Sequence, residues 1–79
     1  MPRDRRELVR NVVVEIARQK VRDDELLVSS GIIDSLRVLN LISRLEDQLQ
    51  IRIPTDQVQP EDFDSVDLIL ETIERVAVS

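Results

Sequence analysis

The chain has 79 residues, 42% of them hydrophobic, with one aromatic side chain, Phe63, and a formal net charge of −5. A chain of this length forms one domain with a single small core, so we expect residues 1–79 to be one domain with an aliphatic core. It has no cysteine and no histidine. This excludes disulfides, thiolate metal sites and nucleophiles activated by an imidazole.

Charge and apolar runs restrict the partners. Residues 1–22 hold seven basic and three acidic side chains, whereas residues 23–79 hold four basic and thirteen acidic ones. We interpret the basic start as a solvated helix face and expect no nucleic acid as partner, because a nucleic-acid-binding domain is basic overall. No apolar run is long enough to span a membrane, and no apolar signal core follows the first residues. We therefore expect a cytoplasmic protein.

The first predicted helix runs from about residue 3 to about residue 20. At 100° per residue, one half of its helical wheel collects Leu8, Val9, Val12, Val13, Ile16 and Ala17. The β-branched run 12–14 is compatible with a strand, but the longer pattern favours a helix. The acidic run of Asp23, Asp24 and Glu25 is interpreted as a solvated part of a long loop.

The second helix is predicted from Asp34 or Ser35 to about Leu49. Its buried stripe is Val38, Leu41, Ile42, Leu45 and Leu49. Asp34 suits the N-cap, because its carboxylate can accept the free backbone donors of the first turn. The sequence Ile51-Arg52-Ile53-Pro54 ends this helix.

Pro54 and Pro60 bracket a connection with room for one short helical turn. The last helix is predicted from near Asp64 or Ser65 to about Ala77, with Phe63 in the core before it. Its buried stripe is Val66, Ile69, Leu70, Ile73 and Val76. The predicted fold is all-α: a small four-helix bundle of three main helices and a short third helix, with a long loop between the first two.

The candidate functional residue is Ser35, at or next to the first position of the second helix. Gly31, the only glycine, allows the preceding turn and is expected to adopt a positive φ. An exposed hydroxyl at a helix N-terminus suits the attachment of an anionic group such as a phosphodiester. Asp34 adds a like charge there, so we assign it as a cap or as a contact for a modifying enzyme.

A simple helix cap is the competing interpretation of Ser35. The chain has a second Asp-Ser pair, Asp64-Ser65, and an Asp-Ser pair alone is more often a cap than a modification site. Ser35, unlike Ser65, follows a leucine, a glycine and two aliphatic residues at fixed spacing. This lead-in favours Ser35 as the modified residue.

The pattern Leu27-x-x-x-Gly31-x-x-Asp34-Ser35-Leu36 resembles the phosphopantetheine attachment motif of the acyl carrier protein family. The similarity covers nearly the whole chain, including the Ile51-x-Ile53-Pro54 exit and the stretch 60–66. The resemblance implies a stand-alone carrier that holds intermediates as thioesters on a 4′-phosphopantetheine arm at Ser35. Since the chain has no thiol, the arm would supply it. A phosphopantetheinyl transferase would install the arm from coenzyme A, and the chain itself would catalyse nothing.

The second helix differs from that of the housekeeping fatty-acid carriers, which the resemblance describes as acidic. Arg37, Asn40 and Arg44 lie on its outer side, and Arg37 and Asn40 replace positions that are usually acidic. This favours a dedicated pathway with polyketide, nonribosomal peptide or aminoacyl intermediates. Leu36 and Leu39 lie away from the buried stripe. With Arg37 and Asn40 they form the predicted contact surface for loading, condensing or transfer enzymes, and we expect a monomer.

Two other functions are weaker. The chain could be an unmodified helical adaptor that binds a partner through Leu36 and Leu39. Asp62, Asp64 and Asp67 have the carboxylates for calcium, but the glycine and the later glutamate of an EF-hand loop are missing. We therefore expect no metal site.

Overall fold

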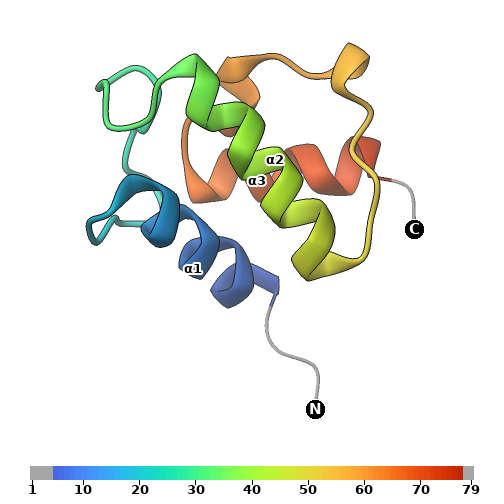
Figure 1. Cartoon of the computed structure of the whole chain (residues 1–79), viewed down its shortest axis with the longest axis horizontal. Coiled ribbons are helices and arrows are strands. Elements are labelled where there is room, and N and C mark those ends of the chain that lie inside the picture. The colour runs from blue at the N-terminus through green and yellow to red at the C-terminus, as the bar shows by residue number, and fades with distance from the viewer. Residues whose placement is uncertain (1–4, 78–79) are drawn as a thin grey trace.

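The computed structural model describes residues 5–77, and the prediction of an all-α fold is confirmed. Three α-helices are joined by a long loop and by two 3₁₀ turns (Figure 1). In chain order the elements are α1 (Arg5–Ala17), α2 (Ser35–Leu49), η1 (Thr55–Gln57), η2 (Pro60–Phe63) and α3 (Val66–Val76). None of the helices within residues 5–77 is long and apolar enough to cross a membrane.

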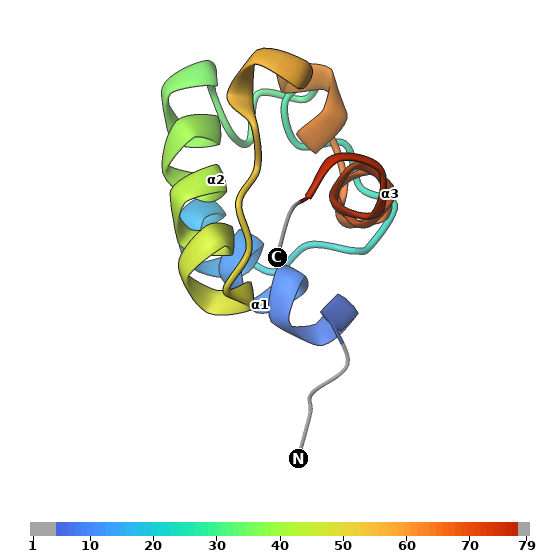
Figure 2. The same ribbon diagram turned by 90° about the vertical axis from the view of Figure 1, so that its right-hand side faces the viewer.

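The helix α1 packs against both other helices, and the turn η2 packs against α3 and α2. Figure 2 shows α3 nearly end-on at the right, with α2 upright on the opposite side of the molecule. The loop 18–34 leaves the end of α1 and climbs to the start of α2, so the N-terminus of α2 lies at one edge of the molecule (Figure 1).

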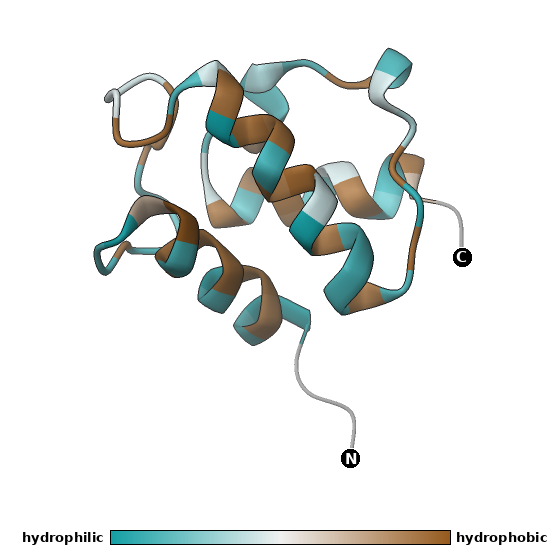
Figure 3. Cartoon of the chain, in the orientation of Figure 1, coloured by the Kyte–Doolittle hydropathy of each residue, from teal (hydrophilic) through white to brown (hydrophobic). Residues whose placement is uncertain are grey.

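The core is aliphatic apart from Phe63, which is fully buried as predicted. Apolar residues line the inner faces of the helices, and polar residues lie mainly on the outer faces (Figure 3). The long loop adds Leu27 and Ile33, both fully buried. Four residues on the predicted apolar faces are only partly buried and pack against the edge of the core: Ile16, Leu49, Leu70 and Val76. Leu8 is also only partly buried.

The helix α1 is shorter than the predicted span of about 3 to 20, whose first two residues lie outside the described part of the chain. It ends at Ala17 because Arg18 adopts a left-handed backbone with φ of 61°. A left-handed residue directly after the last turn is a common way to end a helix. The β-branched run 12–14 is helical, as the longer pattern predicted.

The predicted short turn between Pro54 and Pro60 is confirmed as the 3₁₀ turn η1. A second 3₁₀ turn, η2, which was not predicted, begins at Pro60. Pro60 has the φ that a first helical position needs. Gln59 and Asp62 close this turn with a reciprocal capping box. The short third helix is therefore two tight turns, the second of which carries Phe63 into the core.

Candidate functional site

Ser35 is the first residue of α2, and its side chain is exposed. Asp34 is the N-cap, as predicted, because its Oδ1 accepts the backbone N–H of Arg37 at 2.9 Å. The Asp34 carboxylate therefore caps the N-terminus of α2. Among the described residues the Ser35 hydroxyl has no hydrogen-bond partner, so it remains available.

Gly31 turns the chain toward Ser35. Its φ is +86°, which confirms the predicted positive value. A Cβ built on Gly31 would meet nothing within 4 Å. Glycine is therefore required by the backbone conformation, which other residues adopt only under strain, and not by lack of space.

Asp64, which is only 8% exposed, holds the loop before Gly31. Asp64 Oδ1 accepts three successive backbone N–H groups, from Leu27 at 3.0 Å, Val28 at 2.7 Å and Ser29 at 3.0 Å. Its Oδ2 accepts the Ser29 hydroxyl at 2.5 Å. The backbone carbonyl of Asp64 also accepts from Leu27 N at 2.7 Å. The loop leading to Ser35 is thus fastened to the residue before the N-cap of α3.

Burial by itself would raise the pKa of Asp64, but the hydrogen bonds from Ser29, Val28 and Leu27 outweigh it and leave the pKa lowered. Asp64 is therefore an ionised, buried acceptor. From the sequence Asp64 was predicted as a possible helix start, as half of the Asp64-Ser65 pair and as part of a weak calcium cluster. Its role as the anchor of the loop was missed, because no local spacing reveals a partner more than thirty residues away. The described residues include no group of three or more acidic, histidine or cysteine side chains arranged to hold a metal.

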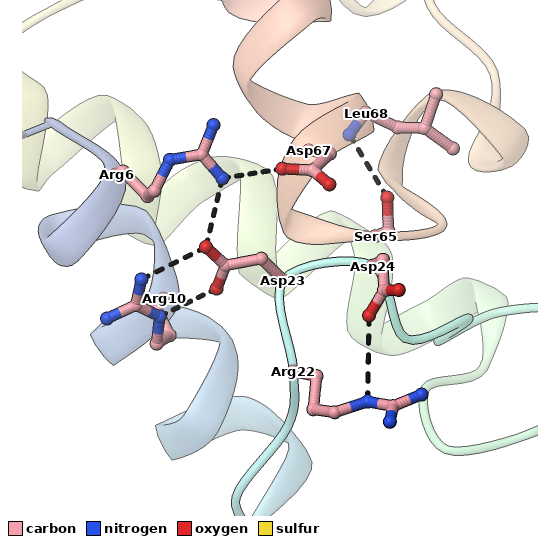
Figure 4. Close-up of polar contacts among 8 residues, drawn as sticks. All are labelled: Arg6, Arg10, Arg22, Asp23, Asp24, Ser65, Asp67 and Leu68. Carbon is pink, nitrogen blue, oxygen red and sulfur yellow. Dashed lines mark hydrogen bonds and ion pairs between the residues drawn. The ribbon is translucent and has the colours of Figure 1, made fainter.

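Ser65 has a different environment from Ser35. It is 4% exposed, and its Oγ accepts the backbone N–H of Leu68 at 3.1 Å (Figure 4). It is the N-cap of α3, whose first residue is Val66. The pair Asp34-Ser35 therefore presents its serine hydroxyl to solvent, whereas the Ser65 hydroxyl of the pair Asp64-Ser65 is buried and caps α3.

Asp23 lies in the long loop, as predicted, but its carboxylate is paired with arginines and not simply solvated. Its carboxylate binds Arg10 Nε at 2.7 Å and Arg6 at 2.9 Å, and Arg6 also binds Asp67 of α3 at 2.5 Å (Figure 4). The hydrogen bond from Arg10 is the main cause that lowers the pKa of Asp23 to about 2. Arg6 and Arg10 lie one turn apart on α1, so they face the returning loop together. Part of the basic start therefore holds the loop to α1 and α3 instead of facing only water.

The surface beside Ser35 combines a small groove with exposed leucines. A groove of about 100 Å³ starts at Ser35 and is lined mainly by apolar side chains of α2 and the η turns, among them Val38, Ile42, Val58 and Phe63. Leu36 is 74% exposed and Leu39 is 58% exposed, as predicted from the helical wheel. Arg37 and Asn40 are exposed on the same helix.

Comparison with known proteins identifies the family. The sequence model of the family described as "Phosphopantetheine attachment site" matches residues 7–73. This chain belongs to that family of carrier proteins. Its members carry a covalently attached 4′-phosphopantetheine, and the protein is a carrier and not an enzyme. The all-helical fold is therefore that of a phosphopantetheine carrier.

Individual carrier proteins with similar sequences share one name. The D-alanyl carrier protein of Streptococcus suis (strain 98HAH33) is 28% identical over 72 residues, 89% of this chain and 91% of the relative. The D-alanyl carrier protein of Streptococcus sanguinis (strain SK36) is 30% identical over 64 residues, 78% of this chain and 81% of the relative. That of Streptococcus uberis (strain ATCC BAA-854 / 0140J) is 34% identical over 53 residues, 67% of each chain.

Proposed function

We propose that this carrier holds its 4′-phosphopantetheine on Ser35 Oγ and uses it to pass an aminoacyl thioester between a loading enzyme and a transfer enzyme. One observation carries the assignment to Ser35. Of the two serines that follow an aspartate at a helix start, Ser35 is exposed, whereas Ser65 is buried and bonded to Leu68 N. Of these two serines, only Ser35 offers a hydroxyl that a modifying enzyme can reach.

The residues around Ser35 fit such an arm. The N-terminus of α2 carries a positive partial charge that favours the phosphodiester anion, although Asp34 as the cap offsets part of it. The apolar groove that starts at Ser35 gives the first part of the arm a surface to lie along. When bound, the arm supplies the thiol that the chain lacks. The chain's own part is to hold Ser35 exposed, on a loop fixed by Gly31 and Asp64.

The cargo is inferred from the relatives and from the outer side of α2. All three relatives described above are named D-alanyl carrier proteins, which supports an aminoacyl cargo over a polyketide or fatty acyl one. The exposed Arg37 and Asn40, in place of acidic residues, support a dedicated pathway. Hydroxylamine cleaves thioesters, so the mass lost on treating carrier purified from its own cells identifies the cargo.

The partners in this proposal are a phosphopantetheinyl transferase that takes the arm from coenzyme A, a loading enzyme and a transfer enzyme. They would approach Ser35 and therefore meet the exposed side chains Leu36, Arg37, Leu39 and Asn40 of α2. The proposal places the protein in the cytoplasm, where coenzyme A is available, as a monomer that exchanges partners.

Intact mass tests the attachment site. The wild-type protein, Ser35→Ala and Ser65→Ala are each incubated with coenzyme A and a phosphopantetheinyl transferase. We expect the mass of one arm to be added to the wild type and to Ser65→Ala, and nothing to be added to Ser35→Ala. A wild-type protein that gains no mass would instead support the helical adaptor that binds through Leu36 and Leu39. A modified Ser35→Ala would move the site elsewhere.

A further inference from the structure

A second, basic groove lies where the end of α1 meets the first turns of α2, across the outer face of α2 from Ser35. It is a shallow hollow of about 220 Å³ lined by Glu15, Ile16, Arg18, Arg37 and Asn40. Arg18 is the left-handed residue that ends α1, and Arg37 lies in the first turn of α2. Two arginines from different elements therefore border one groove, which we call the basic seam.

Neither guanidinium of the basic seam has an ion pair or hydrogen bond among residues 5–77. Other arginines of the described chain do: Arg6 and Arg10 bind Asp23, and Arg44 binds Glu15. Glu15 is the one carboxylate that lines the groove, and Arg44 already occupies it. The seam thus presents two uncompensated positive charges on a chain whose formal net charge is −5.

The basic seam borders the exposed leucines of α2. By the helical period, the outer face of α2 runs from Ser35 across Leu39 and Leu36 to Asn40 and Arg37. An enzyme bound over this face to reach Ser35 contacts the two leucines at its centre. It contacts the positive charges of the basic seam at the edge farther from Ser35. An apolar centre with a charged rim is the usual anatomy of a protein interface, and the charged rim mainly sets partner choice and association rate.

We propose that the basic seam receives acidic side chains of the phosphopantetheinyl transferase that modifies this carrier. The proposal rests on the proposed function, because it takes Ser35 as the modified residue. The transferase is the one partner that the proposed function requires whatever the cargo is. Charge complementarity selects its acidic surface, since a basic surface would be repelled by Arg18 and Arg37. This polarity is opposite to that of carriers whose second helix is acidic.

Charge reversal tests the seam. The variants are Arg18→Glu, Arg37→Glu, the double variant, and Arg52→Glu as a control with the same change of charge. Arg52 is exposed, lies beyond the other end of α2, and has no side-chain partner among the described residues. The readout is kcat/KM of the transferase from the same organism with coenzyme A, at low and moderate salt. Thermal melting verifies that each variant is folded.

We expect kcat/KM to fall on the order of tenfold in the double variant, mainly through KM, because the steering attraction is lost. Added salt should slow the wild type but not the double variant. Arg52→Glu should stay near the wild type. The seam proposal is wrong if the double variant and Arg52→Glu behave alike while all proteins still gain the arm. If the wild type gains no arm, the proposed function itself fails.

Discussion

Asp64 binds Ser29 twice: its Oδ2 accepts the Ser29 hydroxyl at 2.5 Å, and its Oδ1 accepts the Ser29 backbone N–H at 3.0 Å. The two residues lie 35 positions apart in the sequence. Through this pair the loop that leads to Ser35 is fixed to the start of α3. The exposed serine is therefore presented by a loop whose anchor is buried in another part of the chain.

Asp64→Asn should loosen this loop. The amide keeps the shape of the carboxylate, but it has one acceptor oxygen instead of two and turns an NH₂ group toward donors. Leaving buried donors unsatisfied costs about 1–3 kcal/mol, so we expect the free energy of unfolding to fall by that amount and modification at Ser35 to slow. Chemical unfolding and the rate of arm transfer measure the two effects.

Asp62→Asn is the matched control, since Asp62 lies on the same turn and accepts one backbone N–H, from Gln59 at 2.9 Å. It should cost less stability and leave the modification rate unchanged. Equal effects of the two variants would show that Asp64 has no special role in presenting Ser35.

Stability should fall in acid. The pKa of Asp23 is about 2 in the folded protein against an ordinary value of 3.8, and the pKa of Asp64 is also lowered. Because the unfolded chain then takes up protons first, both carboxylates stabilise the fold fully above about pH 5. Their contribution is lost as the pH falls through about 4 toward 2. Urea unfolding across this range measures the slope. Asp23→Asn should have a shallower slope than the wild type, and an unchanged slope would contradict the assignment.

Gly31→Val should impair modification more than folding. The φ of +86° strains a β-branched residue by about 1–3 kcal/mol and would shift the turn before Ser35. Gly31→Asn is the control, because asparagine tolerates positive φ better and the site has open space for a side chain. We expect the rate of arm transfer to decrease in the order wild type, Asn, Val. Equal rates would show that the glycine is incidental.

Leu39→Ala and Leu45→Ala should distinguish a residue that contacts the modifying enzyme from a residue of the hydrophobic core. Leu39 is 58% exposed and Leu45 fully buried, although both are on α2. Truncating Leu45 should cost about 2–5 kcal/mol of stability. Leu39→Ala should melt near the wild type yet be modified slowly, since removing a central apolar anchor typically costs more than about 1 kcal/mol of binding. Thermal melting and modification rates are measured on both variants. If Leu39→Ala is modified at the wild-type rate, Leu39 is not a contact.

The sequence by itself determined the features that depend on neighbouring residues. The span of α2, its cap at Asp34 and the exposure of Leu36 and Leu39 follow from helical periodicity and local capping. The positive φ at position 31 was predictable because this position holds glycine, the residue type that adopts positive φ without strain. These features could be predicted because local backbone preferences and capping depend on neighbouring residues and not on the remainder of the fold. Together they describe the region around Ser35.

Only the tertiary structure decided the features that join distant segments. The pairing of Asp23 with Arg6 and Arg10, and the binding of the loop by Asp64, depend on where α1, the loop and α3 come to lie. The burial of Ser65, which distinguishes it from Ser35, depends on the same packing. A charge in a sequence does not reveal its partner, because the partner is chosen by the path of the chain through space. For this reason the sequence does not reveal that Asp23, interpreted as part of a solvated acidic run, and Asp64, interpreted as a possible helix start, hold the loop of the site in place.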